Sequence, residues 1–111
     1  MTMALQIREC LDPRGRSHFR QWFDGLSPEA SRKVVVALYR VGLGNFSNTK
    51  GVGQGVYECR INFGPGYRVY FGKDGEHIVV LLGGGSKKNQ QRDIQVAIDR
   101  WNEYKRLKEE R

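Results

Sequence analysis

Two arginines in one short stretch of this sequence could do chemistry on a phosphate. The stretch runs from residue 57 to residue 71, YECRINFGPGYRVYF, and its residues alternate between apolar and polar types on both sides of the turn sequence GPG. Alternation with a period of two predicts a hairpin of two strands with an apolar and a polar face. The polar face carries Arg60, Asn62, Arg68 and Tyr70.

The GPG turn favours a register that sets Arg60 opposite Tyr70 and Asn62 opposite Arg68. Diagonal neighbours on one face lie about 7 Å apart, so both arginines share a patch. Like charges this close cost free energy unless an anion lies between them, and guanidinium groups bind phosphate through two hydrogen bonds. We therefore expect a phosphate there. Arginines are also common on ordinary solvent-facing strands, so the hairpin alone leaves both interpretations open.

A second basic group follows the last predicted strand. The segment LLGGGSKKNQ passes through three glycines to the start of a helix, where free backbone amides can hold an anion. Lys87 and Lys88 add positive charge at this point. The spacing is not that of a Walker loop, and a flexible lysine-rich connection is the alternative. Gly51–Gly55, GVGQG, precedes a strand rather than a helix, which argues against a dinucleotide loop.

Histidine and cysteine residues do not suggest a metal or cofactor site. His18 and His77 are far apart, and neither has a second ligand at the usual spacing. Cys10 and Cys59 lack the CxxC spacing, so we expect two reduced thiols, with Cys59 filling the core. Any chemistry is then carried by arginine, lysine and tyrosine.

Composition limits the fold and the partners. With 111 residues and 39% hydrophobic content, we expect one domain over residues 1–111. The net charge of +7 favours polyanionic partners, nucleic acid first and an acidic protein second. The first ten residues, MTMALQIREC, contain no long apolar run. We expect no signal peptide, no membrane association and a cytoplasmic location.

The first half of the chain predicts one strand and two helices. The strand covers residues 3–10, and a helix from about residue 15 or 17 to 25 carries an aromatic stripe at helical spacing. The segment LSPEAS starts a second helix, with Ser27 as cap and Pro28 in the first turn, which runs to about Val41. We expect an antiparallel helical hairpin. The glycine-rich segment GLGNFSNTKGVGQG that follows is expected to be mobile.

The second half predicts strands over Val56–Phe63, Tyr67–Gly72 and His77–Leu82, followed by a helix. The last strand, HIVVLL, is apolar at successive residues, so both of its faces should be covered. The helix has one apolar side: Ile94, Ala97, Ile98, Trp101 and Tyr104. The order β-α-α-β-β-β-α predicts an α+β fold with a small, largely antiparallel sheet, and we expect the helices on one face of it.

The segments YECRINFGPGYRVYF and VVLLGGGSKKNQQRDIQVAIDRWNEYK resemble the RelE/ParE toxin superfamily, in its HigB-like, phage-derived addiction-module branch. The similarity extends to GRSHFRQWFDGLS and GNFSNTKGVGQGVYECR. It implies a RelE-like fold and the toxin of a type II toxin–antitoxin system. It also implies an mRNA interferase, a ribosome-dependent, metal-independent endoribonuclease that needs no cofactor and inhibits translation at the A site.

The resemblance implies roles for particular residues. Arg68 matches the family's strand arginine and would stabilise the transition state, and we expect its replacement by alanine to abolish toxicity without disturbing the fold. Lys87 or Lys88 matches the basic residue after the last strand and is the candidate base, with Tyr70 able to assist proton transfer. The residues expected to bind RNA phosphates are Arg60, Lys50, Asn62 and Arg92.

The expected partners are mRNA on the ribosome and a HigA-like helix-turn-helix antitoxin, through which operator DNA is contacted only indirectly. Several nucleases of the family carry a tyrosine or histidine near the start of the last helix, where this chain has NQQRD. This departure leaves two other functions open. One is a ParE-like, non-catalytic poison of DNA gyrase, and the other is an RNA-binding module without toxicity.

Overall fold

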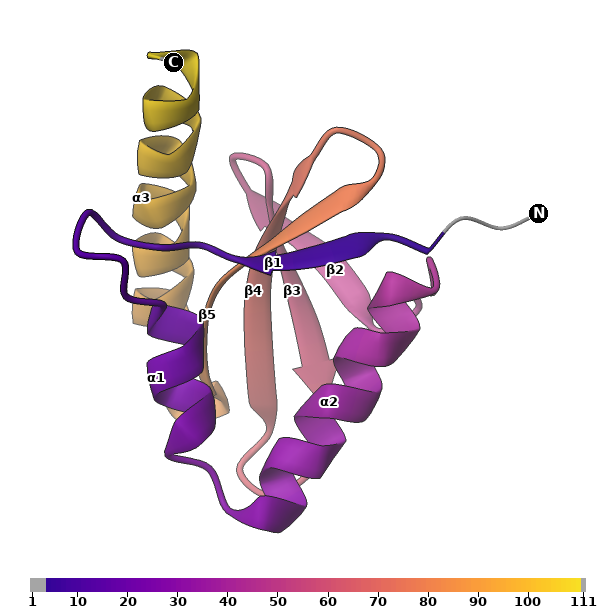
Figure 1. Ribbon diagram of the computed structural model, residues 1–111. Helices are drawn as coiled ribbons and strands as arrows, with labels where there is room; N and C mark the ends of the chain where they lie inside the picture. The colour runs from indigo at the N-terminus through magenta and orange to yellow at the C-terminus, as the bar shows by residue number, and fades with distance from the viewer. Residues whose placement is uncertain (1–3, 111) are drawn as a thin grey trace.

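A five-stranded mixed sheet forms the middle layer of the computed structural model, which describes residues 4–110 (Figure 1). The spatial order of its strands is β1-β5-β4-β3-β2. β1 pairs with β5 in parallel and all other neighbours are antiparallel. The strands are β1 Gln6–Glu9, β2 Thr49–Gly53, β3 Val56–Ile61, β4 Tyr67–Asp74 and β5 Ile78–Ser86. The α+β fold class is therefore confirmed.

The helices begin where the sequence places caps. The Ser27 hydroxyl accepts a hydrogen bond from the amide of Ala30 at 3.2 Å, and Pro28 occupies the first position of α2, Pro28–Gly42. The Ser17 hydroxyl caps α1, His18–Asp24, in the same way. The two helices diverge from their connecting turn into a V rather than packing as an antiparallel hairpin (Figure 1).

Helices cover both faces of the sheet. α1 and α2 enclose one core cluster, which includes Phe19, Val34 and Phe71. The last helix, α3, Gln90–Glu109, encloses a second cluster on the other face with Tyr70 and Leu82. The expectation that every helix packs on one face was wrong. Because β5 is buried on both sides, as its apolar run predicted, it offers α3 an apolar surface of its own.

The glycine-rich segment after α2 contains the edge strand β2. β2 pairs with β3, so that Lys50 lies opposite Glu58. Gln54 and Gly55 at the turn both have positive φ, 50° and 85°, as a two-residue hairpin turn of type I′ requires. This strand was not predicted, because the glycines suggest only turns although the residues between them pair with β3.

Gly83, Gly84 and Gly85 belong to β5 and do not form a loop before the last helix. A Cβ atom on Gly84 would lie 2.2 Å from the Trp22 ring, and one on Gly83 or Gly85 would meet Arg100 or Asp93. Successive strand residues point to opposite faces, so this glycine row lets α1 approach one face and α3 the other. The chain then turns through a short 3-10 segment, η1, Lys87–Asn89, into α3.

Candidate functional site

β3 and β4 place Arg60 directly opposite Arg68, and Glu58 opposite Tyr70. The expected register was therefore wrong by two residues on one strand. The loop is longer than GPG alone, because Ile61 pairs with Tyr67 and the chain turns through residues 62–66. A shift of two residues keeps every side chain on its predicted face. The two arginines thus lie closer together than the sequence suggested.

A polar hollow of about 490 Å³ lies at this turn. Residues 60–68 and Lys87 line it. The backbone amide of Lys87 donates to the carbonyl oxygen of Gly66 at 3.0 Å, which ties the end of β5 to the turn. Four residues predicted for the site therefore meet here: Arg60, Asn62, Arg68 and Lys87. We call this feature the turn hollow.

The guanidinium of Arg68 is held in place at the turn hollow. Its Nη1 donates to the Gly66 carbonyl oxygen at 2.8 Å, and its Nε lies 3.5 Å from Oε2 of Glu58. The residue is only 7% exposed, because α3 covers this part of the polar face. The sequence suggested that Arg68 lies on an open sheet surface, and this was wrong. Because the side chain is buried, its removal must also affect stability.

Glu58 is a member of the site that the sequence analysis did not assign. It is fully buried, and its Oε2 accepts a hydrogen bond from Nε2 of Gln90 at 2.9 Å. Lys50 Nζ lies 3.9 Å from Oε1, so a second cation borders the carboxylate. A buried charge needs such partners. The available signal was that Glu58 supplies the only carboxylate on the polar face of the hairpin.

Arg60 and Lys87 are the free cations of the turn hollow. Both are exposed, and neither forms an ion pair or a side-chain hydrogen bond with another residue among 4–110. Their charges are therefore available to an external anion, whereas Glu58 offsets that of Arg68. A phosphate between Arg60 and Lys87 would contact two flexible cations and one fixed guanidinium.

The structure does not bring Tyr70 into the turn hollow. The residue is 1% exposed and borders a separate hollow of about 370 Å³ with Trp22, Asp93 and Arg100. Its hydroxyl has no hydrogen-bond partner among the described residues. Burial, and then the charge of Glu58, raise the pKa of this phenol well above its ordinary value. Tyr67 is the tyrosine among the residues that line the turn hollow, and its ring packs against Trp22, on the sheet face opposite Arg68.

The remaining predicted residues do not line the turn hollow. Lys88 is exposed next to Lys87 in η1, and Arg92 is exposed in the first turn of α3. Lys50 lies on edge strand β2, with its ammonium group directed toward Glu58. These three cations enlarge the positive surface around the site.

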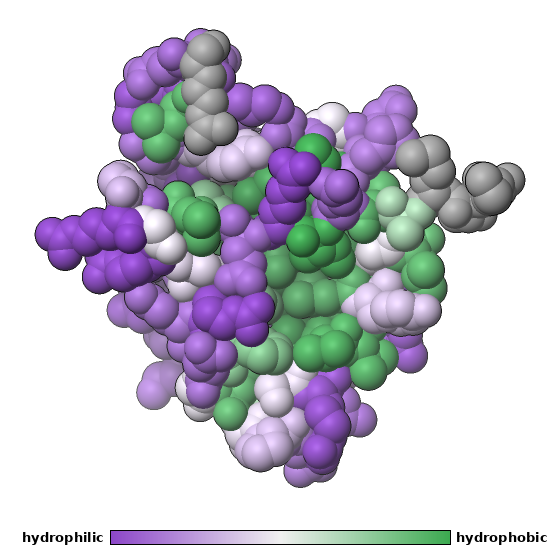
Figure 2. Space-filling model, viewed as in Figure 1, coloured by the Kyte–Doolittle hydropathy of each residue, from purple (hydrophilic) through white to green (hydrophobic). Residues whose placement is uncertain are grey.

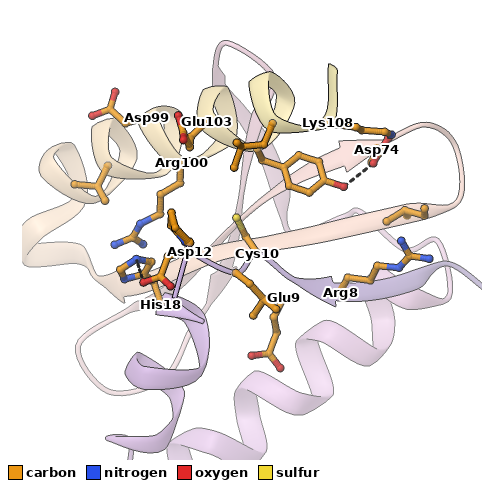
Figure 3. A pocket seen from close by; sticks show the side chains of 16 residues that line it. Arg8, Glu9, Cys10, Asp12, His18, Asp74, Asp99, Arg100, Glu103 and Lys108 are labelled. Carbon is orange, nitrogen blue, oxygen red and sulfur yellow. Dashed lines mark hydrogen bonds and ion pairs between the residues drawn. The ribbon is translucent and has the colours of Figure 1, made fainter. Parts of the chain in front are cut away.

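Another hollow, of about 570 Å³, lies between β1 and the C-terminal half of α3, and none of the predicted site residues lines it (Figure 3). Most of its polar groups are paired, some within the hollow and the others with residues outside its lining. The Tyr104 hydroxyl donates to Oδ2 of Asp74 at 2.6 Å, and Lys108 binds the same carboxylate. Burial and the contact with Asp74 raise the pKa of Tyr104 to about 12. Burial likewise raises the pKa of the Cys10 thiol, which makes a nucleophilic role unfavourable.

Two kinds of feature are absent from residues 4–110. No group of three or more His, Cys, Asp or Glu side chains within residues 4–110 is placed to hold a metal ion. None of the helices in this range combines the length and the hydropathy that crossing a bilayer requires.

Comparison with known families shows which family this chain belongs to. The family model described as "Phage derived protein Gp49-like (DUF891)" matches residues 21–102. This chain belongs to the Gp49-like family. The match includes the turn hollow, Glu58 and most of α3. A relative from Haemophilus influenzae, described as an uncharacterized protein, is 36% identical over 96 residues, which are 86% of this chain and 91% of the relative.

Proposed function

We propose that this Gp49-like protein is the toxin of a type II toxin–antitoxin system and that it cleaves mRNA on the ribosome. The observation that carries the proposal is the arrangement of Arg60 and Lys87 as unpaired cations beside the fixed guanidinium of Arg68. The net charge of +7 and the resemblance to HigB-like toxins support it.

An RNA phosphate in the turn hollow would be bound by Arg60 and Lys87. The ribose 2′-oxygen attacks the adjacent phosphorus, the bond from phosphorus to the 5′-oxygen breaks, and a 2′,3′-cyclic phosphate is formed. Extra negative charge develops on the phosphoryl oxygens during this step. Arg68 is held by Gly66 and Glu58, so it can stabilise that charge without first reorganising.

Two proton transfers accompany this reaction. Lys88, next to Lys87 in η1, is the candidate that accepts the proton of the 2′-hydroxyl, and Tyr67 is the candidate that donates a proton to the departing 5′-oxygen. We assign the second role to Tyr67 rather than to Tyr70, because Tyr70 is buried beside a different hollow.

Primer extension on cellular mRNA after induction tests the proposal. We expect cuts within codons for the wild-type protein, and about 100-fold less cleavage for Arg60→Ala and for Lys87→Ala. Arg14→Ala is the matched control, because Arg14 is an exposed cation in the connection before α1, outside the turn hollow. Growth arrest with intact mRNA would refute the nuclease assignment.

A second candidate is a ParE-like protein that inhibits DNA gyrase without chemistry of its own. It is favoured by the absence of histidine, aspartate and glutamate among the residues that line the turn hollow. Such a site can bind a polyanion, yet it has a limited choice of acid and base. Supercoiling by purified gyrase, with and without the protein, separates the two candidates.

A HigA-like helix-turn-helix antitoxin is the proposed partner, and it would also carry the contacts to operator DNA. The basic charge of the chain supports an acidic partner protein. Coexpression of the product of an adjacent reading frame should restore growth and mRNA integrity. If that product has no effect on growth, it is not the antitoxin.

A further inference from the structure

The side of α2 that faces away from the sheet exposes an unusual amount of apolar surface. Val35, Val36, Tyr39 and Leu43 are 54%, 48%, 67% and 51% exposed. Within residues 4–110 the other large apolar side chain of comparable exposure is Leu11. Large apolar residues exposed together, rather than scattered, indicate an interaction site.

These residues form a continuous surface. Side chains four positions apart on a helix are neighbours, so Val35, Tyr39 and Leu43 make one row, and Arg32, Val36 and Arg40 make a second row beside it. We call these six residues the α2 outer face. The opposite side of α2, with Val34 and Val41, is buried in the core. α2 is therefore apolar on two sides, whereas packing on the sheet requires one.

The apolar surface is also continuous with the rest of this region of the molecule. Figure 2 shows the green, hydrophobic surface of the visible face gathered between α1 and α2, below β1. Leu26 and Leu38 are partly buried apolar residues that pack against the core cluster beneath α1 and α2. A partner segment that lies along α2 can thus contact both the α2 outer face and the apolar surface between α1 and α2.

The charges around the α2 outer face have one predominant sign. Arg32, Lys33 and Arg40 are exposed, and none of them forms an ion pair with another residue among 4–110. Glu29 is the one acidic residue of α2, and it lies in the first turn, where the positive end of the helix dipole stabilises it. The α2 outer face therefore presents an apolar centre and a basic border.

We propose that the α2 outer face is the docking surface for an acidic, amphipathic helix of another protein. Such a helix would place apolar side chains at positions i, i+4 and i+7 against Val36, Tyr39 and Leu43, and carboxylates against Arg32 and Arg40. A second copy of this chain is a poorer occupant. A two-fold axis would bring the same arginines of both copies together, and like charges in an interface are unfavourable.

Lys33, which follows Arg32 of the α2 outer face, lies near the turn hollow. Lys33 Nζ lies 5.6 Å from the centroid of the Phe63 ring, and Phe63 lines the turn hollow. A partner bound to the first half of α2 therefore lies beside the entrance to the site. In this respect the inference rests on the proposed function, under which the partner is the antitoxin and its carboxylates compete with RNA phosphates for the local cations.

Binding of synthetic peptides to the full chain, measured by fluorescence anisotropy, tests the docking surface independently of toxicity. The probe is a helical peptide with leucine at i, i+4 and i+7 and glutamate at the flanking positions. Its comparison peptide has lysine in place of each glutamate. We expect the acidic peptide to bind at micromolar concentrations, more weakly as salt is added, and the basic peptide to bind at least tenfold more weakly.

Val36→Glu and Arg40→Glu should each weaken binding of the acidic peptide at least tenfold. Asn102→Glu and Lys105→Glu make the same charge changes at exposed positions of α3 and should leave it unchanged. Circular dichroism and the melting temperature verify the fold of all four variants. Equal binding of both peptides, no binding of the acidic one, or insensitivity to the α2 substitutions would overturn the proposal.

Two further measurements identify a different occupant. Self-association in sedimentation velocity that Val36→Glu abolishes would assign the surface to a second copy. Sedimentation with anionic phosphatidylserine vesicles that Val36→Glu abolishes would assign it to a membrane surface. Either result, without binding of the acidic peptide, contradicts the inference. Peptide binding by a protein that leaves mRNA intact would instead refute the proposed nuclease activity alone.

Discussion

Arg68 and Glu58 form a buried ion pair beneath the start of α3, with Nε of the arginine 3.5 Å from Oε2 of the glutamate. The side chains are 8% and 0% exposed. The guanidinium that we assign to the transition state therefore has a structural role as well. The effects of Arg68 on stability and on activity can therefore be separated only by substitutions that change one of the two roles at a time.

Glu58→Gln should destabilise the protein by about 3 kcal/mol, because it leaves the guanidinium of Arg68 buried without a counter-charge. Urea unfolding monitored by circular dichroism measures the change. Arg60→Gln is the control, since the side chain is exposed and unpaired, and it should alter stability by less than about 0.5 kcal/mol. If the double variant Glu58→Gln/Arg68→Gln shows purely additive losses, the two side chains are not coupled.

Arg68→Lys should keep the protein folded while reducing mRNA cleavage at least tenfold. Lysine retains one positive charge near Glu58, but it lacks the planar fork that reaches both the Gly66 carbonyl and a phosphate. Arg68→Ala should lose the same activity and also unfold at lower urea concentration, in contrast to the expectation from sequence. Full cleavage by the lysine variant would argue against bidentate recognition.

Gly84→Ala should destabilise the protein by about 1–3 kcal/mol through overpacking, because its Cβ would lie 2.2 Å from the Trp22 ring. Gly51→Ala, in edge strand β2, is the matched control, since nothing lies within 4 Å of a Cβ built there. Thermal unfolding of the two variants measures the difference. Equal melting temperatures would mean that α1 does not rest on the glycine row.

Asp74 should make stability depend on acidic pH. Its hydrogen bonds with Lys108 and then Tyr104 lower the pKa of the folded carboxyl below the ordinary value of 3.8. A depressed pKa contributes stability that is present above 3.8 and is lost as the pH falls through the folded pKa. The stability difference between wild type and Asp74→Asn should therefore be largest near neutral pH and shrink below 3.8.

Lys108→Gln and Tyr104→Phe should each remove part of that pH-dependent difference, because each deletes one partner of the carboxylate. Urea unfolding at several pH values between 2 and 7 is the measurement, a range that brackets the ordinary carboxyl pKa of about 3.9. A difference that stays constant over this range would show that the carboxyl of Asp74 is not stabilised in its ionised form by the fold.

Local patterns in the sequence were sufficient for most elements. The cap at Ser27, the apolar side of α3 with Trp101, and the double burial of β5 were all predicted and are confirmed. Cys59 fills the core as expected, at 1% exposure. These features depend on neighbours within a few residues along the chain, or on a strand that is apolar on both sides, and both kinds of signal are readable directly.

Features that depend on distant partners were not predicted. Glu58 and Arg68 look like solvent-facing strand residues until α3 is placed over them and Gln90 reaches the carboxylate. The three glycines of β5 suggest a loop in the sequence, because the close contact of Gly84 with the Trp22 ring is visible only in the structure. Arg60 and Arg68 were correctly predicted to lie together although the predicted register was wrong. A register shift of two residues leaves each side chain on the same face of the sheet.

β1 pairs with β5 and with no other strand, although nearly all of the remaining sheet-forming chain lies between them. The hairpins that build the turn hollow join strands close in sequence, so they can form early and with little loss of chain entropy. The pairing of Gln6 with Ile78 must wait until the three intervening strands and β5 itself have been synthesised. β1 is the first strand of this sheet to be synthesised, and it is thus the last that can take its place in it.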